Sequence, residues 1–318
     1  MFIYILKLIL TIIFLLITLI SHAIQLEPID KDFTLQLLGS GGPISDNKRS
    51  SSATLIWWKG KSRILIDAGS GSFLRFGQSG AKMEDLDFLG ISHLHTDHVT
   101  DLPALLKNGY FFNRSRVLKI SGPTRRNSFP SLTEYMDALF NSKKGAYAYL
   151  NGIYSGTEGL FPVAIQNVNA DSKARTKVYE KDGLTIWAKS IPHGDVPCLA
   201  YRIESKKGVI VISADQNGSD DTFIDFAKGA DILVMPMAIN EGADNISSFL
   251  HAKPSVVEKI AEAVSPKILI LNHWMGKGLA WKNESLKSIR KSYNAPIFVG
   301  RDLASFPINA VKEENNEK

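Results

Sequence analysis

Apolar and polar positions along the chain follow two periods, and each period predicts a different element. Short apolar runs rich in Val and Ile predict strands, because β-branched side chains pack well on a pleated sheet. The predicted strands are residues 34–38, 54–58, 64–67, 117–121, 185–188, 199–203, 209–213, 232–235, 268–272 and 297–300. Longer segments with apolar residues at helical spacing predict helices at residues 102–107, 131–139, 220–228, 254–264 and 283–293.

The order of these elements indicates the fold class. The early strands follow one another, whereas strands and helices alternate later in the chain. This order predicts an α/β fold in which sheets form the middle and helices cover their outer faces. Residues 141–180 are rich in Gly, Asn, Tyr and Lys, and we expect them to form a loop-rich insertion near the functional site.

The first 23 residues differ from the rest. Lys7 precedes an apolar run of 13 residues, 8–20, and Ser21-His22-Ala23 follows. This arrangement is typical of a secretory signal, and the run is short for a membrane-spanning helix of about 20 residues. We expect a signal at residues 1–23, a folded domain at 24–309 and a polar tail at 310–318. The mature protein would be periplasmic or secreted, without a stable membrane span; an uncleaved anchor is the alternative.

The charge pattern and the single cysteine do not indicate a specific function. The net charge is +5, and the basic pairs are Arg125-Arg126, Lys143-Lys144 and Lys206-Lys207. These pairs are widely separated and lack interleaved aromatic residues, so a solvated surface is favoured over a nucleic-acid stripe. Cys198 cannot form an intramolecular disulfide, and an inert packed thiol is favoured over a nucleophile. The oligomeric state stays open, and a homodimer is possible.

The positions of the histidines indicate a metal-binding site. Three imidazoles and a carboxylate, His93, His95, Asp97 and His98, fall within six residues directly after the apolar run 88–91. Imidazole nitrogen and carboxylate oxygen are ligands that zinc takes. The alternating positions 93 and 95 can point toward one ion while 97 and 98 serve a second. A chance polar loop is the alternative, and this density of donors disfavours it.

Three further donors each follow an apolar strand: His193, Asp215 and His273. Strand ends are where open α/β sheets place their sites. A single Asp or His there is more often a turn residue or a helix cap. Because three of them recur in a chain that already carries a donor cluster, we interpret them as ligands.

Together these features resemble the metallo-β-lactamase superfamily, and its ribonuclease Z-like branch in particular. The matching features are the motif His93-x-His95-x-Asp97-His98, the single residues His193, Asp215 and His273, the glycine-rich residues 38–43, the strand end at Asp67, and His251 at the start of a helix. The resemblance covers roughly residues 33–300. It implies an αββα sandwich of two mixed sheets covered by helices, a catalytic role for the domain at 24–309, and a two-metal site. We expect Gly39, Gly41 and Gly42 to form a tight turn near that site rather than a phosphate-binding loop.

The resemblance also assigns roles. It implies that His93, His95 and His193 hold a first metal ion, that Asp97, His98 and His273 hold a second, and that Asp215 lies between them. The expected ions are two Zn²⁺, with Mn²⁺ or Fe as alternatives. A water-derived hydroxide between the ions would attack the substrate. Asp97 and His251 are the catalytic candidates, His251 as proton donor to the leaving group. Asp67 would support a ligand histidine from behind.

The chain departs from the ribonuclease Z pattern in one place. That branch carries a long arm between the motif histidine and the bridging aspartate and uses it to clamp transfer RNA. Only 21 residues (194–214) lie between His193 and Asp215, enough for two strands joined by a turn at 205–208. Processing of transfer RNA is therefore not expected, and an exported enzyme would not meet it.

The expected substrate is a small-molecule ester. A phosphoric diester or related phosphoester is the first choice, and a sulfate ester (arylsulfatase activity), a lactone or a lactam are alternatives. Two other classes stay open. A redox di-iron protein of this fold would carry a carboxylate in place of His95, and a non-catalytic binding scaffold should have lost ligands.

Overall fold

The computed structural model describes residues 31–309 apart from residues 46 and 113. The predicted signal at residues 1–23 and the polar tail at 310–318 lie outside this part of the chain. Within it, no helix is both long and apolar enough to cross a membrane.

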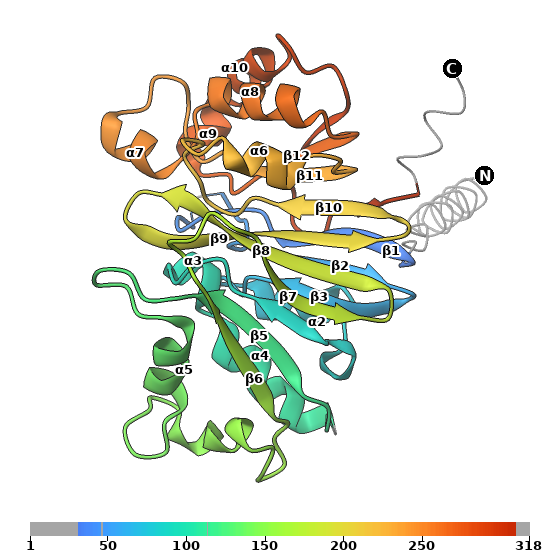
Figure 1. Cartoon of the computed structure of the whole chain (residues 1–318), viewed down its shortest axis with the longest axis vertical. Helices are drawn as coiled ribbons and strands as arrows, with labels where there is room; N and C mark the ends of the chain where they lie inside the picture. Colours follow the sequence, from blue (N-terminus) through green and yellow to red (C-terminus); the bar gives the residue numbers. More distant parts are fainter. Residues whose placement is uncertain (1–30, 46, 113, 310–318) are drawn as a thin grey trace, which may run out of the picture. The chain divides into compact units, whose positions relative to one another are not determined.

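Two seven-stranded mixed sheets form the middle of the described unit (Figure 1). The first sheet has the strand order β14 (Ser305–Pro307), β1 (Phe33–Gly39), β2 (Ala53–Trp58), β3 (Lys61–Ile66), β4 (Phe88–Gly90), β5 (Leu118–Pro123) and β6 (Val163–Val168). Its first four strands pair antiparallel, and β3 to β6 pair parallel. The carboxyl ends of β3, β4 and β5 therefore lie at one edge of the sheet.

The second sheet repeats this arrangement. Its strand order is β13 (Ile297–Val299), β12 (Ile268–Asn272), β11 (Ile232–Pro236), β10 (Gly208–Ile212), β9 (Val196–Ser205), β8 (Leu184–His193) and β7 (Thr176–Lys181). Strands β7 to β10 pair antiparallel, and β10 to β13 pair parallel. Lys206 and Lys207 alone join β9 to β10, as the sequence predicts.

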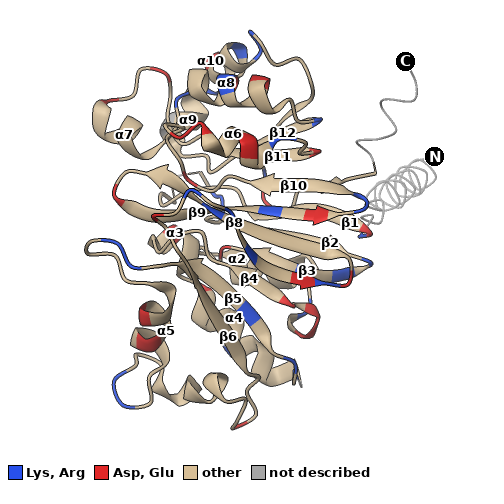
Figure 2. Ribbon diagram, viewed as in Figure 1, with Lys and Arg blue, Asp and Glu red and all other residues tan. Residues whose placement is uncertain are grey.

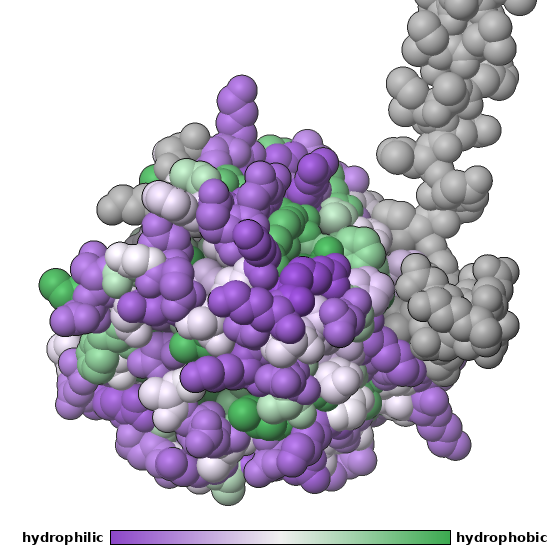
Figure 3. Space-filling model, turned by 90° about the horizontal axis from the view of Figure 1, so that it is seen from above, coloured by the Kyte–Doolittle hydropathy of each residue, from purple (hydrophilic) through white to green (hydrophobic). Residues whose placement is uncertain are grey.

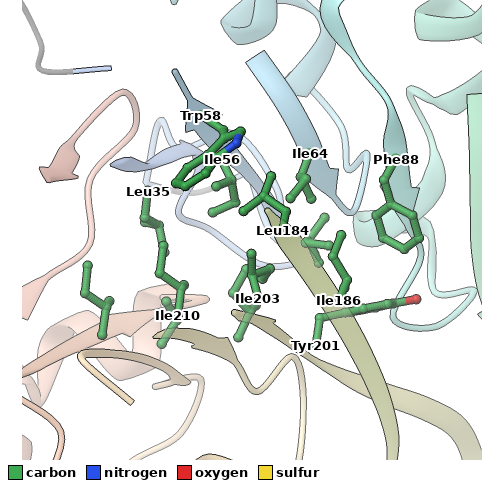
Figure 4. Packing of buried hydrophobic residues seen from close by; sticks show 14 of the residues in the cluster. Leu35, Ile56, Trp58, Ile64, Phe88, Leu184, Ile186, Tyr201, Ile203 and Ile210 are labelled. Carbon is green, nitrogen blue, oxygen red and sulfur yellow. The ribbon is translucent and has the colours of Figure 1, made fainter. Parts of the chain in front are cut away.

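The two sheets pack face to face, and side chains from their inner faces fill the space between them (Figure 4). Leu35, Ile56 and Ile64 from the first sheet meet Ile203 and Ile210 from the second, all fully buried. Strands buried on both faces need near-continuous apolar sequence, which explains why the runs in β10, β11 and β12 show little alternation.

Helices cover the outer face of each sheet. Helices α2 (Ser72–Gln78), α4 (Leu102–Asn108) and α5 (Leu132–Phe140) pack on the first sheet, and α6 (Thr222–Ala227), α8 (Pro254–Val264) and α10 (Lys282–Ile289) on the second. In α8 the buried residues Val257, Ile260, Ala261 and Val264 recur at helical spacing. Seen from the side of α8 and α10, the surface is mostly hydrophilic with small separate hydrophobic areas (Figure 3). The αββα sandwich predicted from the sequence is confirmed.

One expectation about local structure was incomplete and another was wrong. Residues 141–180 are rich in loops, as expected, but they also contain β6, most of β7 and the 3₁₀ helix η3 (Ala148–Tyr154), which packs on α5; β6 and β7 are each an edge strand of one sheet. Half of the residues in each strand are exposed, in no regular alternation, so their sequences lack a clear apolar period. His251 does not open α8: it ends the short helix α7 (Asn245–Leu250), and α8 begins at Pro254.

Charged residues are spread over the described surface. Figure 2 shows Lys and Arg interspersed with Asp and Glu along strands, helices and loops. This distribution agrees with the solvated surface expected from the sequence.

Candidate metal centre

Strand ends bring the predicted donors together at one edge of the sandwich. Asp67 follows β3, His193 ends β8, Asp215 lies just beyond β10, and His273 follows β12. At three of these ends the chain turns through a non-glycine residue with positive φ: Asp67 (64°), Ala214 (51°) and His273 (55°). Such backbone is uncommon and strained outside glycine, and it concentrates at functional sites.

The motif segment crosses between the sheets before it turns into a helix. After β4, the Ser92 carbonyl accepts a hydrogen bond from Leu199 N (2.9 Å) on β9. His95 is the N-cap of the one-turn helix α3 (Thr96–Val99), so Asp97 and His98 fall in its first turn. The His98 carbonyl accepts from Ala68 N at 2.7 Å, which ties α3 to the end of β3.

Three imidazoles form a first donor group. Nδ1 of His95 lies 3.1 Å from Nε2 of His93 and 3.4 Å from Nε2 of His193. Each of these histidines offers a ring nitrogen within 4.8 Å of the others. Two nitrogens that bind one tetrahedral zinc at about 2.1 Å lie about 3.4 Å apart, so the spacing suits ligands of a common ion.

A second donor group contains two carboxylates and two imidazoles. Nε2 of His273 lies 3.1 Å from Oδ2 of both Asp97 and Asp215. Nε2 of His98 lies 3.4 Å from Oδ2 of Asp97 and 3.6 Å from Oδ2 of Asp215. All four residues are buried.

Asp215 adjoins both groups. Its Oδ2 also lies 3.9 Å from Nε2 of His193, a member of the first group. The carboxylate thus faces imidazoles from both groups.

The outer nitrogens of His93, His98 and His193 have partners that fix the ring orientation. The carboxylate of Asp67 accepts from Nδ1 of His98 (2.8 Å) and from the amide and hydroxyl of Ser92 (2.7 and 2.8 Å). The Ser92 oxygen in turn lies 3.0 Å from Nδ1 of His93. The Leu250 carbonyl lies 2.7 Å from Nδ1 of His193. Since the Asp67 carboxylate and the Leu250 carbonyl only accept, Nδ1 of His98 and of His193 carries a hydrogen, and Nε2 of each ring is the nitrogen left to bind a metal.

The two groups differ in their preferred protonation. Burial, reinforced by neighbouring histidines, lowers the pKa of His93, His95 and His193, so these rings are neutral and free to bind a cation. Burial alone would also lower the pKa of His273, but Asp215 and Asp97 raise it to about 9.

The carboxylates explain this difference. Burial opposes their ionisation, yet nearby imidazoles lower the pKa of Asp97 and hold that of Asp215 well below its usual value. The pKa of His98 rises well above its usual value because Asp67, Asp97 and Asp215 outweigh its burial. Two buried carboxylates require compensating positive charge. Protonated imidazoles or a divalent cation can supply it, and a metal would displace those protons.

The donor chemistry fits a pair of divalent ions. In the first group three neutral imidazoles converge, and in the second two carboxylates meet two imidazoles. Nε2 of His98 is buried without a hydrogen-bond partner, an uncommon situation that ligation of an ion would resolve. Borderline nitrogen and oxygen donors of this kind suit zinc.

His251 lies beside both groups. Its Nδ1 is 3.9 Å from Oδ2 of Asp215, and its ring centroid is 5.2 Å from that of His193 and 5.6 Å from that of His273. It also forms a three-donor cluster with His193 and Asp215, so the geometry suits a ligand as well as a proton carrier. Burial lowers the pKa of His251 to about 4.

Several supporting residues escaped the sequence analysis. Ser92 bonds to Asp67, and the Leu250 carbonyl orients His193; only the tertiary fold reveals these contacts. A Cβ on Gly42 would lie 2.6 Å from Cε1 of His273, so the predicted glycine turn packs against a ligand candidate. Cys198 is buried, as expected of an inert thiol, although its Sγ lies 3.6 Å from Nδ1 of His93.

Comparison with known proteins identifies the family. The family described as "Beta-lactamase superfamily domain" matches residues 62–274, about two thirds of the chain. The chain belongs to this superfamily. The metallo-β-lactamase relationship predicted from the motif is therefore confirmed.

Individual members of the superfamily agree with this result. Ribonuclease Z of Mycobacterium sp. (strain KMS) is 26% identical over 250 residues, which cover 75% of this chain and 83% of that protein. The metallo-beta-lactamase fold protein YhfI from Bacillus subtilis matches with a TM-score of 0.66 at 19% identity, covering 86% of this chain and 98% of its own. Human tRNase Z, short form, also matches with a TM-score of 0.66, at 18% identity, covering 86% of this chain and 99% of its own.

The superfamily and the site agree on the chemistry. The chain is a metal-dependent hydrolase of the metallo-β-lactamase fold, as the sequence predicts, and the fold implies divalent metal ions. The curated relative is named as an enzyme that cuts RNA, whose linkages are phosphoesters. That name does not favour the small-molecule ester expected from the sequence.

Proposed function

We propose that the chain is a two-zinc phosphodiesterase that hydrolyses a phosphoric diester. In this proposal His93, His95 and His193 hold one ion, Asp97, His98 and His273 hold the other, and Asp215 serves both. When bound, two such ions activate water and stabilise charge on the attacking and leaving oxygens of an in-line displacement.

One observation carries the proposal. Oδ2 of Asp215 lies 3.1 Å from Nε2 of His273 and 3.9 Å from Nε2 of His193. A single carboxylate oxygen therefore reaches ligand candidates of both groups. Two adjacent ions are the arrangement that suits a phosphoryl centre, where attacking and leaving oxygens carry charge at the same time.

The relatives support a diester over the alternative esters. Ribonuclease Z of Mycobacterium sp. is named as a ribonuclease, and RNA is a chain of phosphoric diesters. The short turn between β9 and β10 offers no arm between His193 and Asp215 to clamp a folded RNA. We therefore propose the diester linkage as the substrate feature and treat RNA and small diesters as two cases to be tested.

The residues around the ions have separate tasks. Asp67 and the Leu250 carbonyl fix the rings of His98 and His193, which keeps their inner nitrogens aimed at the centre. Loss of such an orienting contact typically lowers metal affinity or activity by about 10- to 100-fold.

His251 moves the proton. Burial lowers the pKa of His251 to about 4, which favours a neutral ring at the start of the reaction. We propose that it accepts a proton as water attacks phosphorus and passes that proton to the leaving oxygen as the P–O bond breaks. The products are then a phosphoric monoester and an alcohol, and the ring returns to its neutral state.

We also propose that the protein is exported and carries its signal at residues 1–23. Lys7, the apolar run 8–20 and Ser21-His22-Ala23 support this proposal. N-terminal sequencing of protein from an exported fraction should begin near Ile24. Recovery of intact Met1 from the cytoplasm would reject it.

A substrate panel tests the proposed function. Zinc-loaded protein should hydrolyse bis(p-nitrophenyl) phosphate and an oligoribonucleotide or a small nucleotide diester faster than p-nitrophenyl sulfate, a lactone or a lactam. The comparison of hydrolysis rates between the diesters and the other esters tests the proposed reaction. The comparison between the oligoribonucleotide and the small diester then shows which kind of diester is preferred. A higher rate with sulfate or lactone would reject the phosphodiesterase assignment.

A further inference from the structure

Two phenylalanines flank the first donor group. The ring centroid of Phe129 lies 6.0 Å from that of His95, with the planes at 62°. The ring of Phe249 packs on Gly194, the residue after His193, where an added Cβ would come within 2.9 Å of its Cε1. His95 and His193 are themselves 5.2 Å apart between centroids, so Phe129 adjoins one ring of this pair and Phe249 adjoins the residue that follows the other.

The backbone fixes both phenylalanines in these positions. Phe129 exchanges two backbone hydrogen bonds with Arg126 (2.9 and 3.2 Å) across a tight turn in which Asn127 has a φ of 51°. The Phe249 carbonyl accepts from Nδ2 of Asn217 at 2.6 Å, next to the Leu250 carbonyl that faces His193.

These rings are not needed for the core. Phe249 is 53% exposed, and none of the six residues of α7 is buried. Phe129 is half-buried. An exposed aromatic ring on a helix without buried residues contributes little to the core, so the ring of Phe249 is free to contact a ligand. In Figure 1, α7 projects on the side of the molecule where β8 turns into β9.

We propose that Phe129 and Phe249 bind a planar aromatic group of the substrate next to the phosphoryl centre. The chemistry is that of a phosphoric diester carrying an aryl ring or a nucleobase, since either presents a flat π-surface for stacking. This assignment rests on the proposed function, according to which the substrate is a phosphoric diester. It adds that the two phenylalanines select diesters that carry an aromatic group.

Calorimetric titration of the zinc-loaded protein with phenylphosphonate and methylphosphonate tests the assignment without turnover. Both ligands carry the same anion, and only one carries a ring. The wild type should bind phenylphosphonate about tenfold more tightly, within the range for stacking on one aromatic residue. Phe129→Ala and Phe249→Ala should each reduce that ratio severalfold and leave the methylphosphonate affinity unchanged.

Two further variants separate stacking from a structural role. Phe249→Tyr should keep the preference, and Phe249→Leu should lose it although the apolar bulk is retained. The matched control is Phe111→Ala, an exposed phenylalanine on the 3₁₀ helix η2 (Gly109–Phe112), which should change neither affinity. Thymidine 5′-monophosphate is titrated in parallel. Tighter binding than phenylphosphonate would indicate that the aromatic group of the substrate is a nucleobase, and weaker or equal binding would indicate an aryl group.

The outcomes are distinguishable. Equal affinities for the two phosphonates in the wild type, no binding of phenylphosphonate, or parallel loss of both affinities in the alanine variants would overturn the aromatic site. A phenyl preference without diester hydrolysis in the substrate panel would reject the proposed function and leave the aromatic site standing.

Discussion

The carboxylate of Asp67 lies 2.8 Å from Nδ1 of His98. The backbone of Asp67 has a φ of 64° at the end of β3, which places the side chain in that position. Asp67→Asn keeps a side chain that tolerates this backbone but removes the anionic acceptor. We expect about 10- to 100-fold weaker binding of one of the two zinc ions, because the ring of His98 loses its orienting partner. Competition with a chromogenic chelator measures both affinities. The ion held by the first donor group should weaken less, because Asp67 reaches His93 only through Ser92. Unchanged affinity for both ions would contradict this role of Asp67.

Gly42 tests how closely the glycine turn supports the second ion. An added Cβ in Gly42→Ala would meet Cε1 of His273 at 2.6 Å and displace the ring from Asp97 and Asp215. The variant should lose affinity for one zinc and lose diester turnover in proportion. The control is Gly77→Ala in α2, where nothing lies within 4 Å of the new Cβ and alanine should stabilise the helix slightly. Full zinc affinity in Gly42→Ala would show that His273 does not need this turn.

His251→Ala separates proton transfer from metal binding. It should retain both zinc ions and lose on the order of 10² to 10⁴ in turnover of diesters with alkoxide leaving groups. The loss should be smaller with nitrophenolate, which departs without a proton. Zinc content and rates on both classes of substrate are the measurements. An equal loss for both leaving groups would remove the transfer of the proton to the leaving oxygen, and loss of zinc would make His251 a ligand.

The loop that carries Phe129 is braced by Glu134, which gives a prediction about pH. Hydrogen bonds from Arg125 and from the amide and hydroxyl of Ser131 lower the pKa of Glu134 to about 2. A carboxylate with a lowered pKa stabilises the fold above its unfolded pKa, and this contribution is lost as the pH falls from about 4.5 toward 2. Glu134→Gln should therefore lower the melting temperature at pH 6, and the difference from wild type should shrink at pH 3.5.

An exposed glutamate on another helix serves as the control for this effect. Glu262→Gln on α8 should leave the melting temperature nearly unchanged at both pH values. A difference between wild type and Glu134→Gln that stays constant between pH 6 and pH 3.5 would show that the carboxylate does not contribute through its charge.

The sequence was sufficient where local pattern and burial coincide. The apolar runs before Asp215 and His273 are central strands covered on both faces, so their ends could be located from residue type alone. The helix predicted at residues 254–264 also has the bounds found in the structure. In both cases the periodicity of the apolar residues reports the burial directly.

The remainder depends on contacts between distant segments. The exposed residues of edge strand β6 do not alternate regularly with buried ones, and α7 has no buried residue. Neither element therefore shows an apolar period in its sequence. The contact of Phe129 with His95 and that of Ser92 with Asp67 arise only when loops from different strands meet. Candidate ligands could be predicted because their residue types are distinctive, whereas Ser92 and Leu250, which support them, are ordinary residues.

The central claim is that two zinc ions at this centre hydrolyse a phosphoric diester. The most direct test is the rate of bis(p-nitrophenyl) phosphate hydrolysis by metal-free protein titrated with zinc. The rate should rise until two equivalents of zinc are bound and then stay constant, and Asp215→Ala should show no such rise. Saturation at one equivalent, or no diester hydrolysis at any zinc concentration, would contradict it.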